Sequence, residues 1–85
     1  MTHEPLPTLG RRIRKARQDA GFKNSETLAV HLGVGQRTVQ RWETDKSDPT
    51  IEKLALIAQA TGKPLSYFLD GIVVAAPLRV AEDVA

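Results

Sequence analysis

Two short apolar repeats lie on either side of Gly33-Val34-Gly35, and this close spacing limits what the chain can fold into. Over residues 25–32 the apolar positions recur at helical spacing, and within residues 36–43 Val39 and Trp42 lie three residues apart. A glycine after the last periodic residue is a helix stop signal, and Gly33 occupies that place. The pattern predicts two short helices joined by a tight connection, with Trp42 in the core.

A short turn between two helices is typical of a helix-turn-helix, whose second helix enters the DNA major groove. The predicted helix 36–43 leaves its polar side chains on one face, and they are Gln36, Arg37, Gln40 and Arg41. Arginine pairs with guanine edges and glutamine with adenine edges in the major groove. This face therefore favours DNA base contacts; the alternative is an ordinary solvated face of a small helical domain.

The same periodicity predicts three further helices and therefore an all-α, five-helix fold. One begins at a Thr8 cap and ends at Gly21, one runs from about Thr50 to Gly62, and a short one has Pro64 in its first turn. The polar positions of the first helix carry Arg11, Arg12, Arg14, Lys15 and Arg17. The predicted inward positions outside residues 36–43 are Leu9, Ile13, Ala16, Ala20, Leu28, Ala29, Leu32, Ile51, Leu54, Ile57, Ala58, Leu65, Phe68 and Leu69.

Composition and charge set the domain organisation that we expect. The 85 residues fit one small domain, at residues 8–70, with a flexible N-terminal arm at 1–7 and a C-terminal tail at 71–85. Residues 1–69 hold 11 basic and 7 acidic residues, a net charge of +4, whereas residues 70–85 hold one basic and three acidic residues, a net charge of −2. The basic helical body is compatible with a nucleic-acid partner.

The sequence offers little for catalysis or for metal binding. No cysteine is present, which excludes disulfides and thiolate sites and suits a reducing cytoplasm. His3 and His31 have no second ligand at metal spacing, and no nucleophile–base pair or glycine-rich phosphate loop stands out. No apolar run is long enough for a membrane span. We therefore expect a binding protein without cofactor, metal or enzymatic activity.

About 60 of the 85 residues carry an ordered resemblance to a known family. The matching residues are Leu9-Gly10-Arg11-Arg12-Ile13-Arg14, Arg17, Gly21, Leu28-Ala29, Leu32-Gly33-Val34, Thr38-Val39, Arg41-Trp42-Glu43, Pro49, Leu54, Ile57-Ala58, Gly62 and Leu65. In this set the chain resembles the lambda-repressor-like, Cro-type helix-turn-helix regulators, also called the xenobiotic response element family. The resemblance implies double-stranded DNA as the partner and transcriptional regulation as the function.

The resemblance also implies roles for individual residues. Gln36, Arg37 and Arg41 correspond to base readers, with Gln40 a fourth base contact or a phosphate contact. Arg17 and Glu43 correspond to a pair that bridges the first helix and the end of the third, either orienting the recognition helix or serving structure alone. Phosphate contacts are expected from residues at helix starts and in the loop after helix 36–43. These residues are Lys23, Ser25, Thr38, Thr44 and Lys46, with Ser25 standing where the family frequently has a phosphate-contacting glutamine.

A single recognition helix reads few base pairs, so we expect a homodimer on two half-sites. Leu56 and Tyr67 lie off the inward stripes of their helices, and Ile72, Val73 and Val74 follow as an apolar run. Together these residues are the expected dimer contact, unless the tail covers its own domain. The function that we expect is repression by a phage-type or bacterial regulator. The alternatives are an antitoxin that binds its own operator and a protein-interaction module that does not bind DNA.

Overall fold

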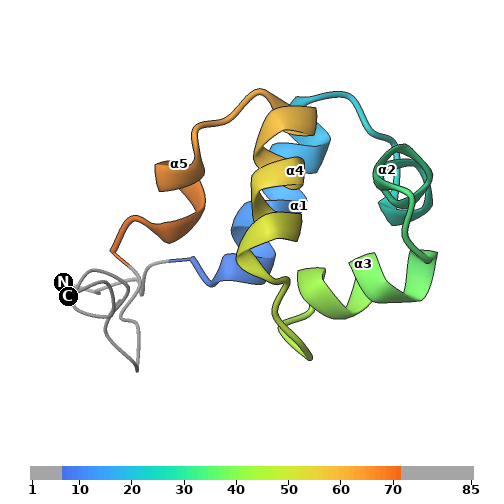
Figure 1. Cartoon of the computed structure of the whole chain (residues 1–85), viewed down its shortest axis with the longest axis horizontal. Coiled ribbons are helices and arrows are strands. Elements are labelled where there is room, and N and C mark those ends of the chain that lie inside the picture. Colours follow the sequence, from blue (N-terminus) through green and yellow to red (C-terminus); the bar gives the residue numbers. More distant parts are fainter. Residues whose placement is uncertain (1–6, 72–85) are drawn as a thin grey trace, which may run out of the picture.

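The computed structural model describes residues 7–71, which form five α-helices and, within that range, no strand (Figure 1). The helices are α1 Leu9–Asp19, α2 Ser25–Leu32, α3 Gln36–Glu43, α4 Ile51–Thr61 and α5 Leu65–Leu69. This confirms the all-α, five-helix fold. The division into arm, domain and tail stays a prediction, because most of the arm and tail lies outside the described residues. No helix of residues 7–71 has the length and apolar character needed to cross a membrane.

Short polar side chains begin three of the helices. Thr8, Asn24 and Thr50 each precede a helix, and a side-chain oxygen of each accepts a hydrogen bond from a backbone N–H of the first turn, at 2.9–3.2 Å. Such caps satisfy N–H groups that have no partner within the helix. The sequence predicted the Thr8 cap. By contrast Gly35, which precedes α3, makes no side-chain cap.

The turn between α2 and α3 depends on the backbone of Gly33. This residue ends α2 with φ +75°, in the left-handed region that glycine adopts without steric cost.

Two predictions of helix boundaries, at Gly21 and Pro64, were wrong by one position. Gly21 lies just beyond Ala20, which is the C-cap of α1, and Pro64 is the N-cap of α5 instead of a first-turn residue.

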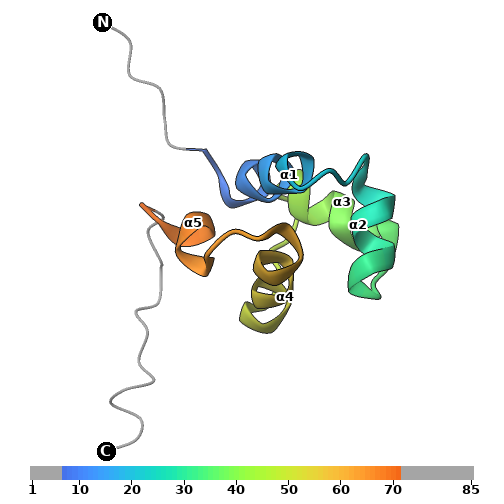
Figure 2. The ribbon, with the colours of Figure 1, turned by 90° about the horizontal axis from the view of Figure 1, so that it is seen from above.

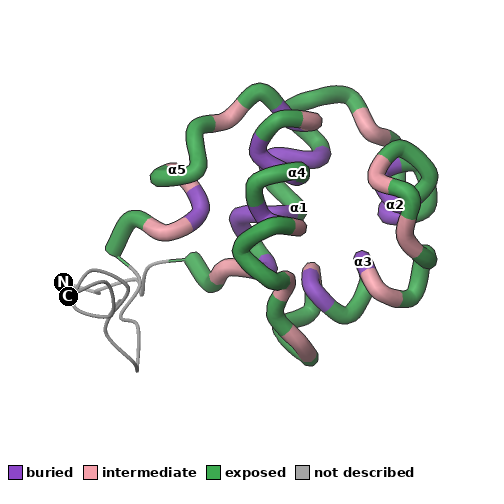
Figure 3. Tube along the Cα trace, viewed as in Figure 1, coloured by how far each residue is buried: buried purple, intermediate pink, exposed green. Residues whose placement is uncertain are grey.

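The core is formed by residues of all five helices, and each of its members is at most 8% exposed. Its members are Ile13, Ala16, Leu28, Ala29, Val39, Trp42, Leu54, Ile57, Ala58 and Phe68. The prediction that Trp42 belongs to the core is therefore confirmed. The buried positions lie on the inner sides of α1, α3 and α4 (Figure 3). Leu9, Leu32 and Leu69 are half-buried and pack against this core.

Three predictions of inward-facing positions were wrong, and all three residues lie at helix ends. Ala20 is exposed, Ile51 is 60% exposed and Leu65 is 37% exposed, although all three were predicted to face inward. Ala20 is the C-cap of α1, and Ile51 and Leu65 are the first residues of α4 and α5. Arg12 and Arg17 occupy polar positions of α1 in the sequence, and they are buried, at only 7% and 5% exposed.

The helices are arranged so that α3 has neighbours on its inner side only. Within residues 7–71, α3 contacts α1 and α2, whereas α4 contacts α1, α2 and α5, and α5 contacts α1 and α4. In both views α5 lies at the end of the molecule away from α2 and α3 (Figures 1 and 2). This arrangement leaves the outer face of α3 open.

Candidate nucleic-acid interface

The two faces of α3 differ sharply in burial. Val39 is fully buried and Trp42 is 5% exposed, which fixes the rotation of the helix about its axis. The opposite face therefore points outward, and its polar side chains are all exposed. They are Gln36, Arg37, Gln40 and Arg41, the four residues that the sequence singled out as base contacts.

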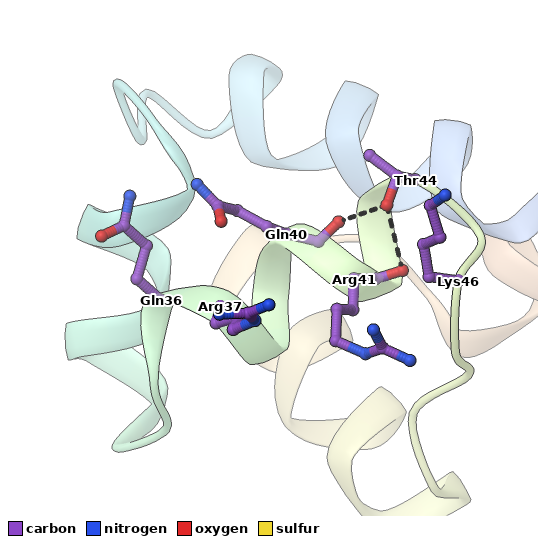
Figure 4. Close-up of a pocket in the computed structure, with 6 residues that line it drawn as sticks. All are labelled: Gln36, Arg37, Gln40, Arg41, Thr44 and Lys46. Atoms are coloured by element: carbon purple, nitrogen blue, oxygen red, sulfur yellow. Dashed lines mark hydrogen bonds between the residues drawn. The ribbon is translucent and has the colours of Figure 1, made fainter.

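These four side chains share one open hollow with two residues that follow the helix. The hollow has a volume of about 720 Å³ and is lined by Gln36, Arg37, Gln40, Arg41, Thr44 and Lys46 (Figure 4). The Thr44 hydroxyl donates to the backbone oxygen of Gln40 at 2.8 Å. The backbone N–H of Lys46 donates to the backbone oxygen of Arg41 at 2.9 Å. These bonds hold the segment after α3 beside the helix end, so that Lys46 joins the polar face.

The charge of this hollow is positive. Arg37, Arg41 and Lys46 line it, and no carboxylate oxygen of residues 7–71 lies within 4.0 Å of their charged nitrogens. Cations that are not neutralised by neighbouring acids attract a polyanion over a distance of about a Debye length. The hollow thus combines side chains that can pair with base edges and cations that can bind phosphates.

A buried ion pair fixes the end of α3 to α1. The Arg17 Nε lies 2.7 Å from Oε2 of Glu43, its Nη2 lies 3.4 Å from Oε1, and both side chains are less than a tenth exposed. The Arg17 Nη1 also donates to the backbone oxygen of Phe22 at 3.0 Å. One guanidinium therefore joins α1, the end of α3 and the connector that precedes α2. The structure brings together the two residues that the family resemblance pairs.

A second link between α1 and the end of α3 was missed in the sequence. Asp45 adopts φ +62°, and its carboxylate accepts hydrogen bonds from the Gly10 N–H at 2.9 Å and from the Thr8 hydroxyl at 2.6 Å. Gly10 permits this approach, because a Cβ there would lie 2.5 Å from the backbone oxygen of Trp42. The available signal was that aspartate tolerates the left-handed region better than most residues.

Three of the other predicted phosphate contacts, Lys23, Ser25 and Thr38, do not line the hollow, whereas Thr44 does. Lys23 is exposed in the connector before α2, and Thr38 is half-buried on α3. Ser25 is only 9% exposed, so its hydroxyl offers little surface to a ligand. Thr44 is exposed, with its hydroxyl bonded to the helix end.

The predicted dimer residues do not share one hollow in the described part of the chain. Leu56, 41% exposed, lines a hollow with His31, Leu32, Gln59 and Ala60. Tyr67 is half-buried and lines a different hollow, near Pro7 and Arg12. Ile72, Val73 and Val74 lie outside the described residues, as does His3. His31 is exposed with its ring 5.3 Å from that of Phe22, and no group of three potential metal ligands occurs among residues 7–71.

Comparison with known proteins agrees with this geometry. A family model described as helix-turn-helix matches residues 13–68. The chain is 31% identical over 64 residues to an uncharacterized transcriptional regulator in the ATPase CF(0) region of Rhodospirillum rubrum, a match that covers 75% of this chain and 58% of that protein. It is also 31% identical over 62 residues to the HTH-type transcriptional regulator ImmR of Bacillus subtilis (strain 168), covering 73% and 48%. The matches thus span about half the length of these relatives.

Proposed function

Because this chain belongs to the helix-turn-helix family, we propose that it binds a specific double-stranded DNA sequence and regulates transcription as a repressor. In this proposal α3 enters the major groove with its outer face toward the bases. The relatives named as transcriptional regulators support the regulatory role. Repression additionally requires that the DNA site overlap a promoter.

One observation carries the proposal. The exposed side chains of α3 converge on one positive hollow, while Val39 and Trp42 hold the other face in the core. Arg37 and Arg41 can each donate two hydrogen bonds to a guanine, and glutamines can pair with adenine. We assign base reading to Gln36, Arg37, Gln40 and Arg41.

Phosphate binding is assigned to the residues that flank this face. Lys46 lies in the hollow and Lys23 is exposed before α2, so both can bind phosphate oxygens as point charges. Thr38 and Thr44 are secondary candidates that would contribute a hydroxyl. The burial of Ser25 leaves its backbone N–H, in the first turn of α2, as the group to test there.

We further propose that the operator has two half-sites about one helical turn apart and that two copies of the chain bind it. The contact between copies is assigned to Leu56 or Tyr67 together with residues 72–74. Since Leu56 and Tyr67 line different hollows, separate Leu56→Ala and Tyr67→Ala variants should distinguish the two faces. Sedimentation of these variants, with and without operator DNA, measures the association.

The proposed function is tested by selecting bound DNA from a random pool at a stated salt concentration. A selected motif with two related half-sites is the expected result, and binding should weaken steeply with salt. Retention of DNA without any enriched sequence would contradict specific recognition. Failure to retain DNA at low salt would leave a protein-interaction module as the better description.

A further inference from the structure

Two arginines of α1 are buried to a similar extent, but their surroundings differ. Arg17 is 5% exposed and pairs with the carboxylate of Glu43. Arg12 is 7% exposed; its Nε donates to the Pro7 oxygen and its Nη1 to the Tyr67 oxygen, each at 3.2 Å. No carboxylate oxygen of residues 7–71 lies within 4.0 Å of Arg12. Among the described residues, Arg12 is thus a buried cation without a paired anion.

Such a cation needs more compensation than two neutral carbonyls provide. Burying a charge is costly unless it is paired, and a guanidinium has five N–H donors, of which two donate to atoms of residues 7–71. Arg12 lines an open hollow of about 620 Å³, and no buried side-chain nitrogen of residues 7–71 lacks a hydrogen-bond partner, so any donor of Arg12 left without a partner there reaches the surface. The other lining residues are Pro7, Pro64, Ser66, Tyr67, Asp70 and Gly71.

We propose that this hollow is a carboxylate site and that the chain's own acidic pair, Glu82-Asp83, fills it. Gly71 lines the hollow, so the segment that carries this pair leaves from its wall. The eleven residues 72–82 can span roughly 36–40 Å when extended, and closing a loop of this length costs little more than closing a shorter one. Direct contact with Arg12 would reproduce the arrangement of Arg17 with Glu43.

Apolar residues between Gly71 and the acidic pair strengthen this assignment. Ile72, Val73 and Val74 directly follow Gly71 in the sequence, and Leu65, between the lining residues Pro64 and Ser66 in the sequence, is 37% exposed. Covering that surface would stabilise a returning segment before the carboxylate makes its contact. Two competing carboxylates are Asp70, which lines the hollow beyond 4.0 Å from Arg12, and Glu4, near Pro7 in sequence.

The test follows the Arg12 side-chain Nε–H signal by NMR in the isotopically labelled full chain at low salt. Arg17 is the internal reference, because it is equally buried and has its partner within the domain. Three variants are compared with the parent: the double variant E82Q/D83N and the single variants E4Q and D70N. Each change replaces a carboxylate with an amide and leaves every residue of the described core unaltered, so the domain should stay folded.

The expected result is that the Arg12 signal shifts in the E82Q/D83N variant alone while the Arg17 signal stays in place. The folding equilibrium constant should also fall about two- to fivefold in that variant, as for a partly exposed ion pair. An unmoved Arg12 signal overturns the proposal. So does a shift produced only by E4Q or D70N, or one that depends on protein concentration, which would place the carboxylate on a second copy. The experiment does not involve DNA, so it stands apart from the proposed function.

Discussion

The carboxylate of Asp45 accepts the backbone N–H of Gly10 at 2.9 Å, which joins the residue just beyond the C-cap of α3 to the first turn of α1. The contact places a negative charge at a helix N-terminus, where N–H groups without helical partners and the helix dipole favour it. Together with the Arg17–Glu43 pair, it ties the end of α3 to both ends of α1. These two links hold the outer face of α3 in a fixed orientation.

Removing the Asp45 carboxylate should therefore destabilise the fold. Asp45→Ala loses both hydrogen bonds and keeps a left-handed backbone, so we expect a loss of about 1–2 kcal/mol in the free energy of unfolding. Asp45→Gly should lose less, because glycine adopts φ +62° without steric cost. Urea unfolding measures both, with Asp48→Ala as the control from an exposed position in the same loop. Equal stability of the Asp45→Ala and Asp48→Ala variants would show that the contact contributes nothing.

The buried Arg17–Glu43 pair should show strong energetic coupling. Arg17→Ala leaves the Glu43 carboxylate buried without its partner, and the loss approaches about 3–5 kcal/mol when burial is complete. A double variant, Arg17→Met with Glu43→Leu, should recover much of that loss, since it leaves no buried charge. A double-mutant cycle by urea unfolding gives the coupling energy. Additive effects of the two single changes would show that Arg17 and Glu43 are not energetically coupled.

Helix positions could be predicted from the sequence because their signals are local. Asn24 lies immediately before α2 and Gly33 immediately after it, and Val39 with Trp42 sets the buried face of α3. The same pair of apolar residues implies which side of α3 is exposed. The assignment of that side to DNA bases stays a prediction from residue chemistry and family resemblance.

Contacts between distant residues could not be predicted in the same way. Arg12 occupies a polar position of the α1 repeat, yet a carbonyl 55 residues away accepts its hydrogen bond. Asp45 lies in a segment that composition marks only as a loop, and its partner Gly10 is 35 residues earlier. Periodicity gives the face of one helix but not which backbone atoms of another element meet it.

The Asp19 carboxylate should make stability depend on pH in the acid range. A hydrogen bond from Lys15, with a second contribution from Lys63, holds the pKa of Asp19 below its ordinary 3.8. A lowered pKa in the folded state stabilises the fold above the ordinary value, and this gain is lost as the pH falls through the lowered value. The parent should thus exceed Asp19→Asn in stability at neutral pH, with the difference vanishing in acid. A difference in the free energy of unfolding between the parent and Asp19→Asn that stays constant across pH would contradict this.

Sequence preference should depend on the two arginines of α3. Arg37→Ala or Arg41→Ala should each cost about 1–3 kcal/mol on the best site and relax preference at one base pair, as expected for a lost bidentate contact. Folding should survive because both side chains are exposed. Arg14→Ala is the matched control, since Arg14 is exposed on α1 and does not line the hollow. If both α3 variants keep the parent's preference, α3 is not the reading element.

Lys46 should contribute affinity without contributing preference. It lines the same hollow as the base-reading candidates, but its flexible ammonium suits phosphate oxygens, which occur at every sequence. Lys46→Ala should therefore weaken binding by a similar factor on the selected site and on unrelated DNA. For this variant, the slope of log affinity against log salt concentration should also be less steep by about 1, since one fewer phosphate is neutralised. Fluorescence titrations at several salt concentrations measure both quantities. A changed base preference with an unchanged salt slope would instead place Lys46 among the base readers.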